Sequence, residues 1–599
     1  MHDEHERTAE SHDSTRPQGP RMVLSDASAA LALAEQAVGS RVIAQTADPS
    51  SADALLATAR EAAEQGERVA VVARAESLAA SREAMRRIAQ ARLAVVAHAI
   101  AGHGGEDLAA LSDLGWGVLC ASGPEDSFDL ALIARRAAED SGVPFVVVHA
   151  HGHAEAGTGR AHAMVALPQA KACQDFVGPA SRMKPRHDPS HPSLAPLGDR
   201  AFAERVPFAL GSALREYANV SGRRHDVFDK VPLGEAPLML VGMGPVGDAL
   251  FHAVSELRAR GYDVGAVHVS TLRPFPGAKL VKALARALAI TVLEPVDEPM
   301  AHGGLLAREV KSAFTDALTW APGFPGIGRI PKLFVGVTGP SFDVNDLAAI
   351  CDNMLADERG RRSFSFADAD HRLPVATTAG PRNASTSIRW VLDDVATANV
   401  ALSVTAAVLA SALGLRAHGL VTPERTGTGA TVDLVATREH ARGAMARREP
   451  RLVISTDRGI ASASTIAPLA PGAVLAVLSG AGDPNLPDAA RVLVRECRVR
   501  ALPLAWGGAA EDATFAIAAT CAGASLALGA RVQRTMLDPI VVARLVAEDL
   551  TTRGVTDPGP MAERARRAFE ATLEAVESAE RDGAGRSASD DRPRSPTVA

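Results

Sequence analysis

Short apolar stretches alternate with amphipathic segments along most of this 599-residue chain. Between residues 41 and 145, apolar positions recur with the period of a helix in the segments that separate five apolar stretches: RVIAQ, RVAVVA, LAVVAHA, GWGVLCA and VPFVVVHA. Strands that are buried on both faces read as continuous apolar runs, and parallel strands need a crossover helix between them. The pattern therefore predicts an α/β fold of doubly wound domains with mainly parallel sheets.

Changes in composition divide the chain into parts, and its length suits about three to five domains. We expect a mostly disordered N-terminal segment (1–38), a first α/β domain (39–170), a Pro- and His-rich connector (171–235), a second domain (236–356), a polar linker (357–387), a third α/β domain (388–575) and a disordered tail (576–599).

Charge and aromatic content exclude two classes of partner. The net charge is −7, which disfavours nucleic acid and anionic membranes, and 4% aromatic residues offer few platforms for base stacking. We find no apolar run near the roughly 20 residues of a membrane span, and no apolar signal core near the N-terminus. The sequence therefore predicts a cytoplasmic protein with no nucleic-acid or membrane partner.

The five cysteines are scattered along the chain without a C-x-x-C spacing: Cys120, Cys173, Cys351, Cys497 and Cys521. An iron–sulfur cluster needs four thiolates brought together, usually from a short local run. We therefore expect no iron–sulfur cluster in this chain.

A glycine-rich turn in PLMLVGMGPVGDAL allows two interpretations. Gly242, Gly244 and Gly247 form a G-x-G-x-x-G between an apolar strand and a helix, which is the pattern of a dinucleotide-binding turn. However, the next strand, DVGAVHVS, ends without the acidic residue that would bind a ribose hydroxyl. The chain continues with TLRPFP (271–276), a helix, a strand that closes on Glu294, and HGGLLAREV.

That order of motifs resembles the transketolase-C-like domain of the 2-oxoacid:ferredoxin oxidoreductases. The first domain also resembles this family, most strongly in GWGVLCASGPEDSFDLALIARRAAEDSGVPF. In the third domain, PERTGTGATVDLVA resembles the γ domain that some members add. The resemblance implies a fused α/γ-type subunit with a thiamine-pyrimidine-binding-like domain, a transketolase-C-like domain and a γ-type domain, in that order.

The resemblance also implies an activity and partners. Such a subunit takes part in the oxidative decarboxylation of a 2-oxo acid such as pyruvate. The family uses thiamine diphosphate and Mg²⁺. A β/δ-type partner would carry the thiamine diphosphate and iron–sulfur modules and pass electrons to ferredoxin or flavodoxin, within an oligomer.

The sequence departs from the family where the cofactor chemistry lies. Thiamine enzymes need a carboxylate against the pyrimidine ring. Asp48, Ser50 and Ser51 stand in a turn that resembles the family's P-I-T-P-S-S, and they are the catalytic candidates. About fifteen residues then remain before Gly66, too few for the family's intervening strand and helix, and the only glutamates there, Glu61 and Glu64, are typical of a solvated helix face.

Two further departures fall on the cofactor-binding segments. Glu125 and Asp126 stand near the family's Q-E and are the cofactor-binding candidates. The glycine turn of the γ domain is replaced by a segment with Asp393 and Asp394, which would repel phosphate. We also find no segment like the family's diphosphate- and Mg²⁺-binding module. We therefore expect an incomplete thiamine site in this chain alone.

Two other groups of residues are candidates for binding. Arg273, Glu294, His302 and Gly303 are expected at the C-terminal edge of the second domain's sheet, where ligands of open α/β domains bind. Alternatively, Arg273 caps a strand edge.

The first domain offers a possible metal site. His149, His151 and His153 alternate along the end of a strand and so share one face, with His103, Asp107 or Glu155 as further ligands. The alternative is a polar loop without metal.

These residues support three hypotheses. The chain is an α/γ-type subunit of a 2-oxoacid:ferredoxin oxidoreductase; or it is a degenerate paralogue that acts as a scaffold or regulator of such a complex; or it is an NAD-dependent oxidoreductase that uses the Gly242–Gly247 turn.

Overall fold

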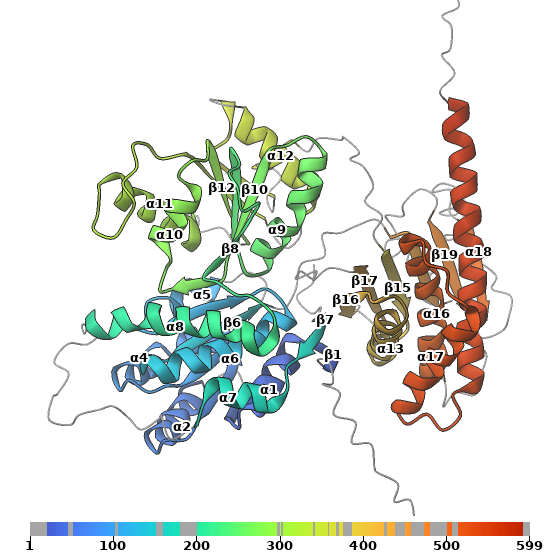
Figure 1. Ribbon diagram of the computed structural model, residues 1–599, viewed down its shortest axis with the longest axis horizontal. Coiled ribbons are helices and arrows are strands. Elements are labelled where there is room, and N and C mark those ends of the chain that lie inside the picture. The colour runs from blue at the N-terminus through green and yellow to red at the C-terminus, as the bar shows by residue number, and fades with distance from the viewer. Residues whose placement is uncertain are drawn as a thin grey trace, which may run out of the picture.

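The protein has three α/β domains, and in Figure 1 the second lies above the first while the third lies beside them. The computed structural model describes residues 21–45, 52–101, 106–150, 160–179, 200–295, 300, 303–338, 342–356, 359–366, 371–374, 386–423, 428–437, 450–456, 473–479, 500–505 and 513–590.

The first domain has a six-stranded sheet in the order β11-β5-β6-β4-β3-β2. Its five own strands are parallel: β2 (Arg41–Ala44), β3 (Val69–Arg74), β4 (Val96–Ala101), β5 (Gly117–Ala121) and β6 (Phe145–Ala150). One face packs on α2 (Ala52–Glu64), α3 (Ala75–Ala80), α4 (Arg82–Gln90) and α5 (Glu106–Leu111). The other face packs on α1 (Ala27–Ala37), α6 (Pro124–Ser141), α7 (Ala170–Val177) and α8 (Arg200–Ser221). The predicted doubly wound arrangement is confirmed here.

The second domain repeats this architecture with the sheet order β14-β13-β12-β9-β10-β8. The strands are β8 (Phe228–Val231), β9 (Leu238–Met243), β10 (Val264–Val269), β12 (Ala289–Glu294), β13 (Lys332–Val337) and β14 (Ser363–Ser365), and all pairs except β8–β10 are parallel. Helices α9 (Gly244–Ala259) and α12 (Val344–Leu355) cover one face. Helices α10 (Gly277–Leu284) and α11 (Leu305–Leu318) cover the other.

The third domain has a mixed sheet, which differs from the mainly parallel sheet that we expected. Its strands are β15 (Thr386–Leu392), β16 (Arg416–Pro423), β17 (Ala430–Thr437), β18 (Leu452–Thr456), β19 (Val474–Ser479) and β20 (Arg500–Ala505). Strands β16, β17 and β15 pair antiparallel, whereas β15, β18, β19 and β20 are parallel. Only six residues join β16 to β17, too few for the crossover that a parallel pair requires.

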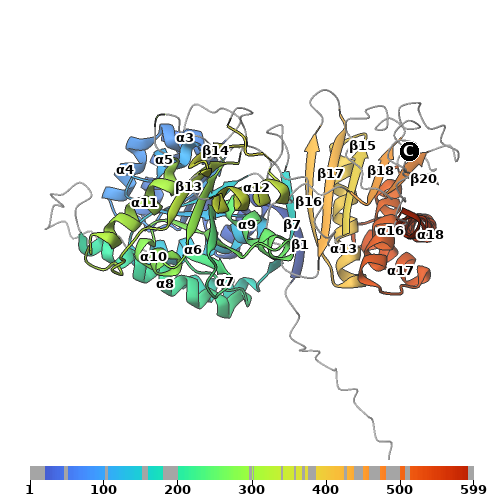
Figure 2. The same ribbon diagram turned by 90° about the horizontal axis from the view of Figure 1, so that it is seen from above.

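The third sheet continues into the N-terminal part of the chain. Strand β1 (Arg21–Asp26) pairs antiparallel with β7 (Arg160–Leu167), and β7 pairs antiparallel with β16. One eight-stranded sheet therefore links the first and third domains, as Figure 2 shows from above.

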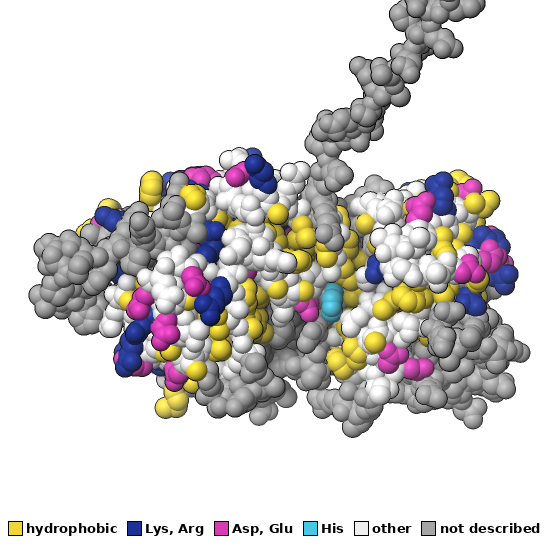
Figure 3. Space-filling view, turned by 90° about the horizontal axis from the view of Figure 1, so that it is seen from below, with side chains coloured by type: hydrophobic (Ala, Val, Ile, Leu, Met, Phe, Trp, Pro, Cys, Tyr) yellow, Lys and Arg dark blue, Asp and Glu magenta, His cyan; other side chains and the backbone are white. Residues whose placement is uncertain are grey.

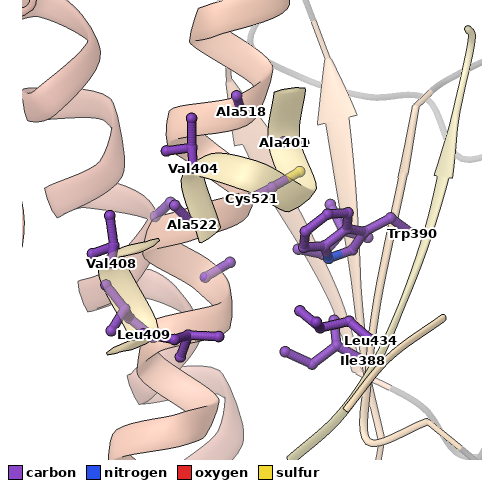
Figure 4. Packing of buried hydrophobic residues seen from close by; sticks show 14 of the residues in the cluster. Ile388, Trp390, Ala401, Val404, Val408, Leu409, Leu434, Ala518, Cys521 and Ala522 are labelled. Atoms are coloured by element: carbon purple, nitrogen blue, oxygen red, sulfur yellow. The ribbon is translucent and has the colours of Figure 1, made fainter. Parts of the chain in front are cut away.

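The core of the third domain is built from alanine-rich helices on this sheet. The helices are α13 (Val395–Leu413), α16 (Ala513–Gln533), α17 (Pro539–Thr552) and α18 (Gly559–Asp590). In Figure 4, Trp390 and Leu434 of the sheet face Cys521 of α16 and Leu409 of α13.

Two of these helices correct the expectation that no segment could span a membrane. Helices α13 and α16 are long and apolar enough to cross one, by length and composition. Both instead belong to the third domain's core, and the most apolar window of α16 is 83% buried in the fold. Such helices are typical of a protein interior.

Ordered elements lie in four of the segments between and beside the predicted domain cores, whereas the domain limits themselves stay a prediction. Segment 1–38 contains β1 and α1, and α1 is fixed because Ala30, Leu31 and Ala34 are buried and Asp26 caps its start. The connector contains α7, α8 and β8, and the linker contains β14. Residues 576–590 of the predicted tail belong to α18, which is held by Arg531 and Arg451 pairing with Glu580.

Candidate functional site at the junction of the first two domains

The TLRPFP segment joins the second domain to the first. Its strand β11 (Thr271–Arg273) leaves the second domain and pairs antiparallel with β5, at the edge of the first domain's sheet. Leu272 is fully buried in the first domain's core. The two domains therefore share backbone hydrogen bonds as well as side-chain contacts.

Arg273 strengthens the same junction. Its guanidinium donates to the Ser112 carbonyl oxygen (3.1 Å) and to Asp113 (3.1 Å) in the first domain, and to Glu309 of α11 (2.8 Å) in the second. These contacts agree with the alternative role, in which Arg273 holds a strand edge, more than with an anion contact.

The glycine turn brings backbone segments together and leaves little room for a ligand. A Cβ on Gly247 would lie 2.6 Å from the Gly242 carbonyl oxygen and 2.4 Å from the His268 ring. A Cβ on Gly244, whose φ is +55°, would lie 3.6 Å from the Ala121 carbonyl oxygen of the first domain. A dinucleotide needs space for its pyrophosphate at this helix start. The first domain's backbone lies there instead, which disfavours the NAD interpretation.

Glu294 and Gly303 stabilise the N-terminus of α11. The Glu294 carboxylate accepts hydrogen bonds from the backbone N–H groups of Leu306 (2.8 Å) and Ala307 (3.2 Å), and so caps α11. Gly303 has a φ of +111°, which favours glycine in the turn that leads there. His302 lies outside the described residues.

Glu125 and Asp126 lie in the first turn of α6, as expected, but both have protein partners. Asp126 accepts from the Ser122 backbone N–H (2.8 Å) and hydroxyl (3.1 Å). Glu125 accepts from the Ala166 N–H (3.2 Å) and pairs with Arg223 (3.4 Å). Their role as cofactor ligands stays a prediction.

The structure does not support His149 as a metal ligand. Its Nδ1 lies 2.9 Å from the Ser127 hydroxyl oxygen and its Nε2 lies 3.0 Å from His98 Nδ1, so both ring nitrogens are occupied. No group of three metal-binding side chains occurs among the described residues. The other proposed ligands, His103, His151, His153 and Glu155, and the side chain of Asp107, lie outside them.

His149 belongs to a buried chain of side chains that the sequence did not reveal. His98 Nε2 lies 3.0 Å from a Glu35 oxygen, and Arg135 donates to both Glu35 oxygens at 3.0 and 3.1 Å. Burial alone would raise the pKa of Glu35, but Arg135 and His98 outweigh it and lower this pKa to about 2.

A second buried cluster also lies on α6. The Asp129 carboxylate accepts from Arg223 Nε (2.6 Å), His225 Nε2 (2.8 Å) and the Tyr217 hydroxyl (2.7 Å). Burial alone would raise the Asp129 pKa, yet these partners lower it, and the same carboxylate together with burial raises the pKa of Tyr217. This cluster fixes α8 and the following segment on the first domain.

Both clusters had a signal in the sequence. His98 interrupts the apolar run LAVVAHA, and Arg135 lies inside the apolar helix LALIARRA. A charged or polar residue that a pattern places in a core needs a buried partner. The pattern could have indicated that partners exist, but it does not say which.

Asp248 is a buried carboxylate in the first turns of α9. Its Oδ1 lies 3.5 Å from His252 Nε2, and its Oδ2 has no hydrogen-bond partner within the described part of the chain. Burial raises the pKa of Asp248, which His252 and His268 only partly offset.

The remaining candidates lie apart from this junction. Asp48, Ser50 and Ser51 are outside the described residues. Glu61 and Glu64 are on the exposed face of α2, where Glu64 pairs with Arg60. In the third domain, Asp394 caps α13 by accepting from the Thr397 N–H (2.7 Å), and Asp393 accepts from the Thr456 hydroxyl (2.6 Å).

Comparisons with known proteins agree with this arrangement. Residues 27–201 match the family described as pyruvate flavodoxin/ferredoxin oxidoreductase, thiamine diphosphate-binding. Residues 236–326 match pyruvate:ferredoxin oxidoreductase core domain II. The first two domains belong to the 2-oxoacid:ferredoxin oxidoreductase family.

Curated relatives of this family match only part of the chain. Pyruvate synthase subunit PorA of Pyrococcus furiosus is 24% identical over 215 residues, which cover 32% of this chain and 50% of PorA. Ketoisovalerate oxidoreductase subunit VorA of Pyrococcus abyssi is 27% identical over 259 residues, which cover 40% of this chain and 62% of VorA. The chain thus spans about half to three fifths of the length of these relatives.

A solved structure of 2-oxoglutarate:ferredoxin oxidoreductase from Magnetococcus marinus, with 2-oxoglutarate, coenzyme A and succinyl-CoA bound, is also similar. The match has a TM-score of 0.41 at 12% identity and covers 56% of this chain and 65% of that one. A score this low adds nothing to the family assignment.

Whether the first domain of this chain holds a complete thiamine diphosphate site stays a prediction, because Asp48, Ser50 and Ser51 lie outside the described residues. The carboxylates that follow β3 and β5 already have partners: Glu76 pairs with Arg74, Asp126 with Ser122, and Glu125 with Ala166 and Arg223.

Proposed function

We propose that this chain is an α/γ-type subunit of a 2-oxoacid:ferredoxin oxidoreductase. The complex would oxidatively decarboxylate a 2-oxo acid such as pyruvate and pass the electrons to ferredoxin or flavodoxin. The chain would supply the pyrimidine-binding-like and transketolase-C-like domains, and its third domain would take the place of the γ domain.

One observation carries this proposal. The two family matches fall on two domains in the family's order, and these domains are built into one unit because β11 pairs with β5. A chance likeness of apolar strands would not be expected to preserve both the order of the domains and the motif that joins them.

Cofactors and the electron-transfer module are proposed on a β/δ-type partner. The scattered cysteines suit an iron–sulfur module elsewhere, and four of them are buried in different parts of the fold: Cys120, Cys173, Cys351 and Cys521. Thiamine diphosphate and Mg²⁺ would bind where this chain meets that partner. Basic and acidic side chains are interspersed on the face in Figure 3, which suits a protein partner in the cytoplasm more than nucleic acid.

Purification and reconstitution test the proposal. The tagged chain should co-purify with a protein that has four-cysteine motifs and a thiamine diphosphate site. The reconstituted complex should reduce ferredoxin when pyruvate or another 2-oxo acid is added. A chain that binds no such protein, under conditions in which a PorA-type subunit does, would contradict the proposal.

A second function, that of a scaffold or regulator, is supported by Asp393 and Asp394. These two residues stand where the family has a glycine turn, and their carboxylates accept hydrogen bonds from Thr456 and Thr397, respectively. If the chain is a degenerate paralogue, it should assemble with the partner while the complex stays inactive. Turnover equal to that of a complex with an intact family member would exclude this role.

A further inference from the structure

Exposed apolar side chains gather at one edge of the second domain's sheet. Ten large apolar side chains are exposed in the part of the chain that the structure describes. Five of them lie at helix ends or in loops at the N-terminal edge of this sheet: Leu233, Leu288, Leu318, Trp320 and Leu355. The opposite edge adjoins the first domain through β11 and Gly244, so the N-terminal edge points away from that domain. Single apolar side chains are common on a surface, whereas a gathered set marks an interaction site.

Two short loops form the centre of this surface. Leu233, which is 94% exposed, lies between β8 and β9, and Leu288, which is 55% exposed, immediately precedes β12. The Leu288 N–H donates to the Pro237 carbonyl oxygen at 2.8 Å, which joins the two loops. Glu235 and Arg286 form an ion pair between them, and both side chains are exposed. The centre therefore has two leucines beside one acidic and one basic side chain.

A third loop adds an exposed tryptophan in a fixed position. Trp320 follows α11 with a φ of +59°, and its ring lies so close to Gly326 that a Cβ there would be 2.4 Å from it. The loop ends at Lys332, whose N–H donates to the Leu288 carbonyl oxygen at 3.0 Å, so it adjoins the centre. The Trp320 residue is nevertheless 74% exposed. Tryptophan is enriched among the residues that dominate binding at interfaces, and a side chain that is already ordered loses little entropy on binding.

Glu235 and Arg286 indicate what covers this surface. A twofold axis brings the same patch of two molecules face to face. Because the centre carries one negative and one positive charge, a second copy can place its Arg286 beside Glu235 and its Glu235 beside Arg286, with the leucines packed between them. Charges of a single sign at the centre would repel their own copies.

We propose that two copies of this chain associate about a twofold axis through Leu233, Glu235, Arg286, Leu288 and Trp320, called here the second-domain patch. The patch lies at the opposite end of the second domain's sheet from the junction with the first domain. Self-association therefore does not compete with a partner that binds at that junction. The inference is independent of the proposed electron-transfer function, and its test needs no partner subunit.

Sedimentation velocity of the full chain over a range of protein concentrations tests the proposal. The chain should be in equilibrium between monomer and dimer. Leu233→Asp and Leu288→Asp should each raise the dissociation constant of the dimer by about thirtyfold or more, the effect of losing a dominant interface residue. Ile540→Asp, at an exposed site in the third domain, is the control and should leave this constant unchanged. A chain that is monomeric at every concentration, or an equal effect of the control, would overturn the proposal.

Two charge variants test whether the same patch meets itself. Glu235→Arg makes both central charges positive, and Arg286→Glu makes both negative. Each variant alone should be monomeric at concentrations where the unaltered chain is dimeric, because like charges then face each other. An equimolar mixture of the two variants should form dimers that contain one of each. If each variant dimerises as the unaltered chain does, or if the mixture stays monomeric, the patch does not face its own copy.

Fluorine NMR of the chain labelled with fluorotryptophan locates the contact. The Trp320 signal, assigned with Trp320→Phe, should move as the dimer forms, because the exposed ring becomes covered. The signals of Trp116 and Trp390, which are buried in the first and third domains, should stay in place. A dimer that leaves the Trp320 signal unchanged would place the contact elsewhere and contradict the proposal.

Discussion

Two helix-covered sheet faces of this protein, one in the first domain and one in the third, are built in opposite ways. Around α6, the first domain buries two ionic clusters, centred on Glu35 and Asp129. Around α13 and α16, the third domain buries mostly alanine, leucine and valine, as Figure 4 shows. Both faces pack alanine-rich helices on a sheet, so the helix composition does not explain the difference.

The comparison indicates where the helices and strands need one fixed relative position. Apolar packing tolerates many arrangements, whereas a buried charge is stable only when its partners are in place. The clusters hold α1, α8 and the end of β6 in one relative position, at the edge that adjoins the second domain. The described core of the third domain has no comparable requirement.

Breaking the Asp129 cluster should have the largest effect. Asp129→Ala leaves Arg223 buried without its partner and should cost about 3–5 kcal/mol. The measurement is urea unfolding followed by Trp116 fluorescence, in a variant whose other tryptophans, Trp320, Trp390 and Trp506, are phenylalanine. Asp140→Ala is the control, because its pairing with Arg136 is partly exposed and should be worth less than about 1 kcal/mol. Equal losses would refute the distinction.

In the third domain, a substitution that leaves a cavity in the apolar core should have the next largest effect on stability. Leu409 is fully buried, and Leu409→Ala should cost about 2–5 kcal/mol whether measured at pH 5 or at pH 7. Trp390 reports this domain, and exposed Ile540→Ala should change stability by less than about 0.5 kcal/mol. A cost that varies strongly with pH would mean that this core depends on charge after all.

Acid should unfold the first domain before the third. The lowered pKa of Glu35 means that its contribution is complete above its ordinary value of 4.5 and is lost as pH falls toward about 2. This loss is on the order of 3 kcal/mol, and Asp129 acts in the same direction. Between pH 4.5 and 2, Trp116 should report unfolding before Trp390 does. Simultaneous transitions would contradict the comparison.

The smallest expected effect concerns Asp248, a buried carboxylate that lacks part of the hydrogen-bond partners that Glu35 and Asp129 have. The Asp248 pKa is raised by burial, so folding is penalised at pH values above its ordinary 3.8. Asp248→Asn should therefore stabilise the second domain at pH 7, by an amount on the order of 1 kcal/mol, and give no gain below pH 3.8. Asp263→Asn, at an exposed site, is the control for urea unfolding.

Local patterns predicted most of the elements but only part of the site. The G-x-G-x-x-G turn and the TLRPFP motif were found in the sequence, and their order suggested the family. The sequence left two roles open for Arg273 and did not indicate that Glu294 caps a helix, because a strand-edge contact or a helix cap depends on what lies beside the residue. Glu35, His98 and Asp129 were missed because the pattern shows a polar residue near or within an apolar segment but does not identify its partner.

The alternation of apolar runs and amphipathic segments by itself determined that the chain forms successive α/β domains, because strand and helix periods are local properties. The tertiary structure alone decided that β11 completes the first domain's sheet and that β1 and β7 extend the third. It also decided that His98 lies between Glu35 and His149, which are 63 and 51 residues away in sequence. Such pairings depend on which surfaces meet after folding, and the period of a sequence contains no information about that.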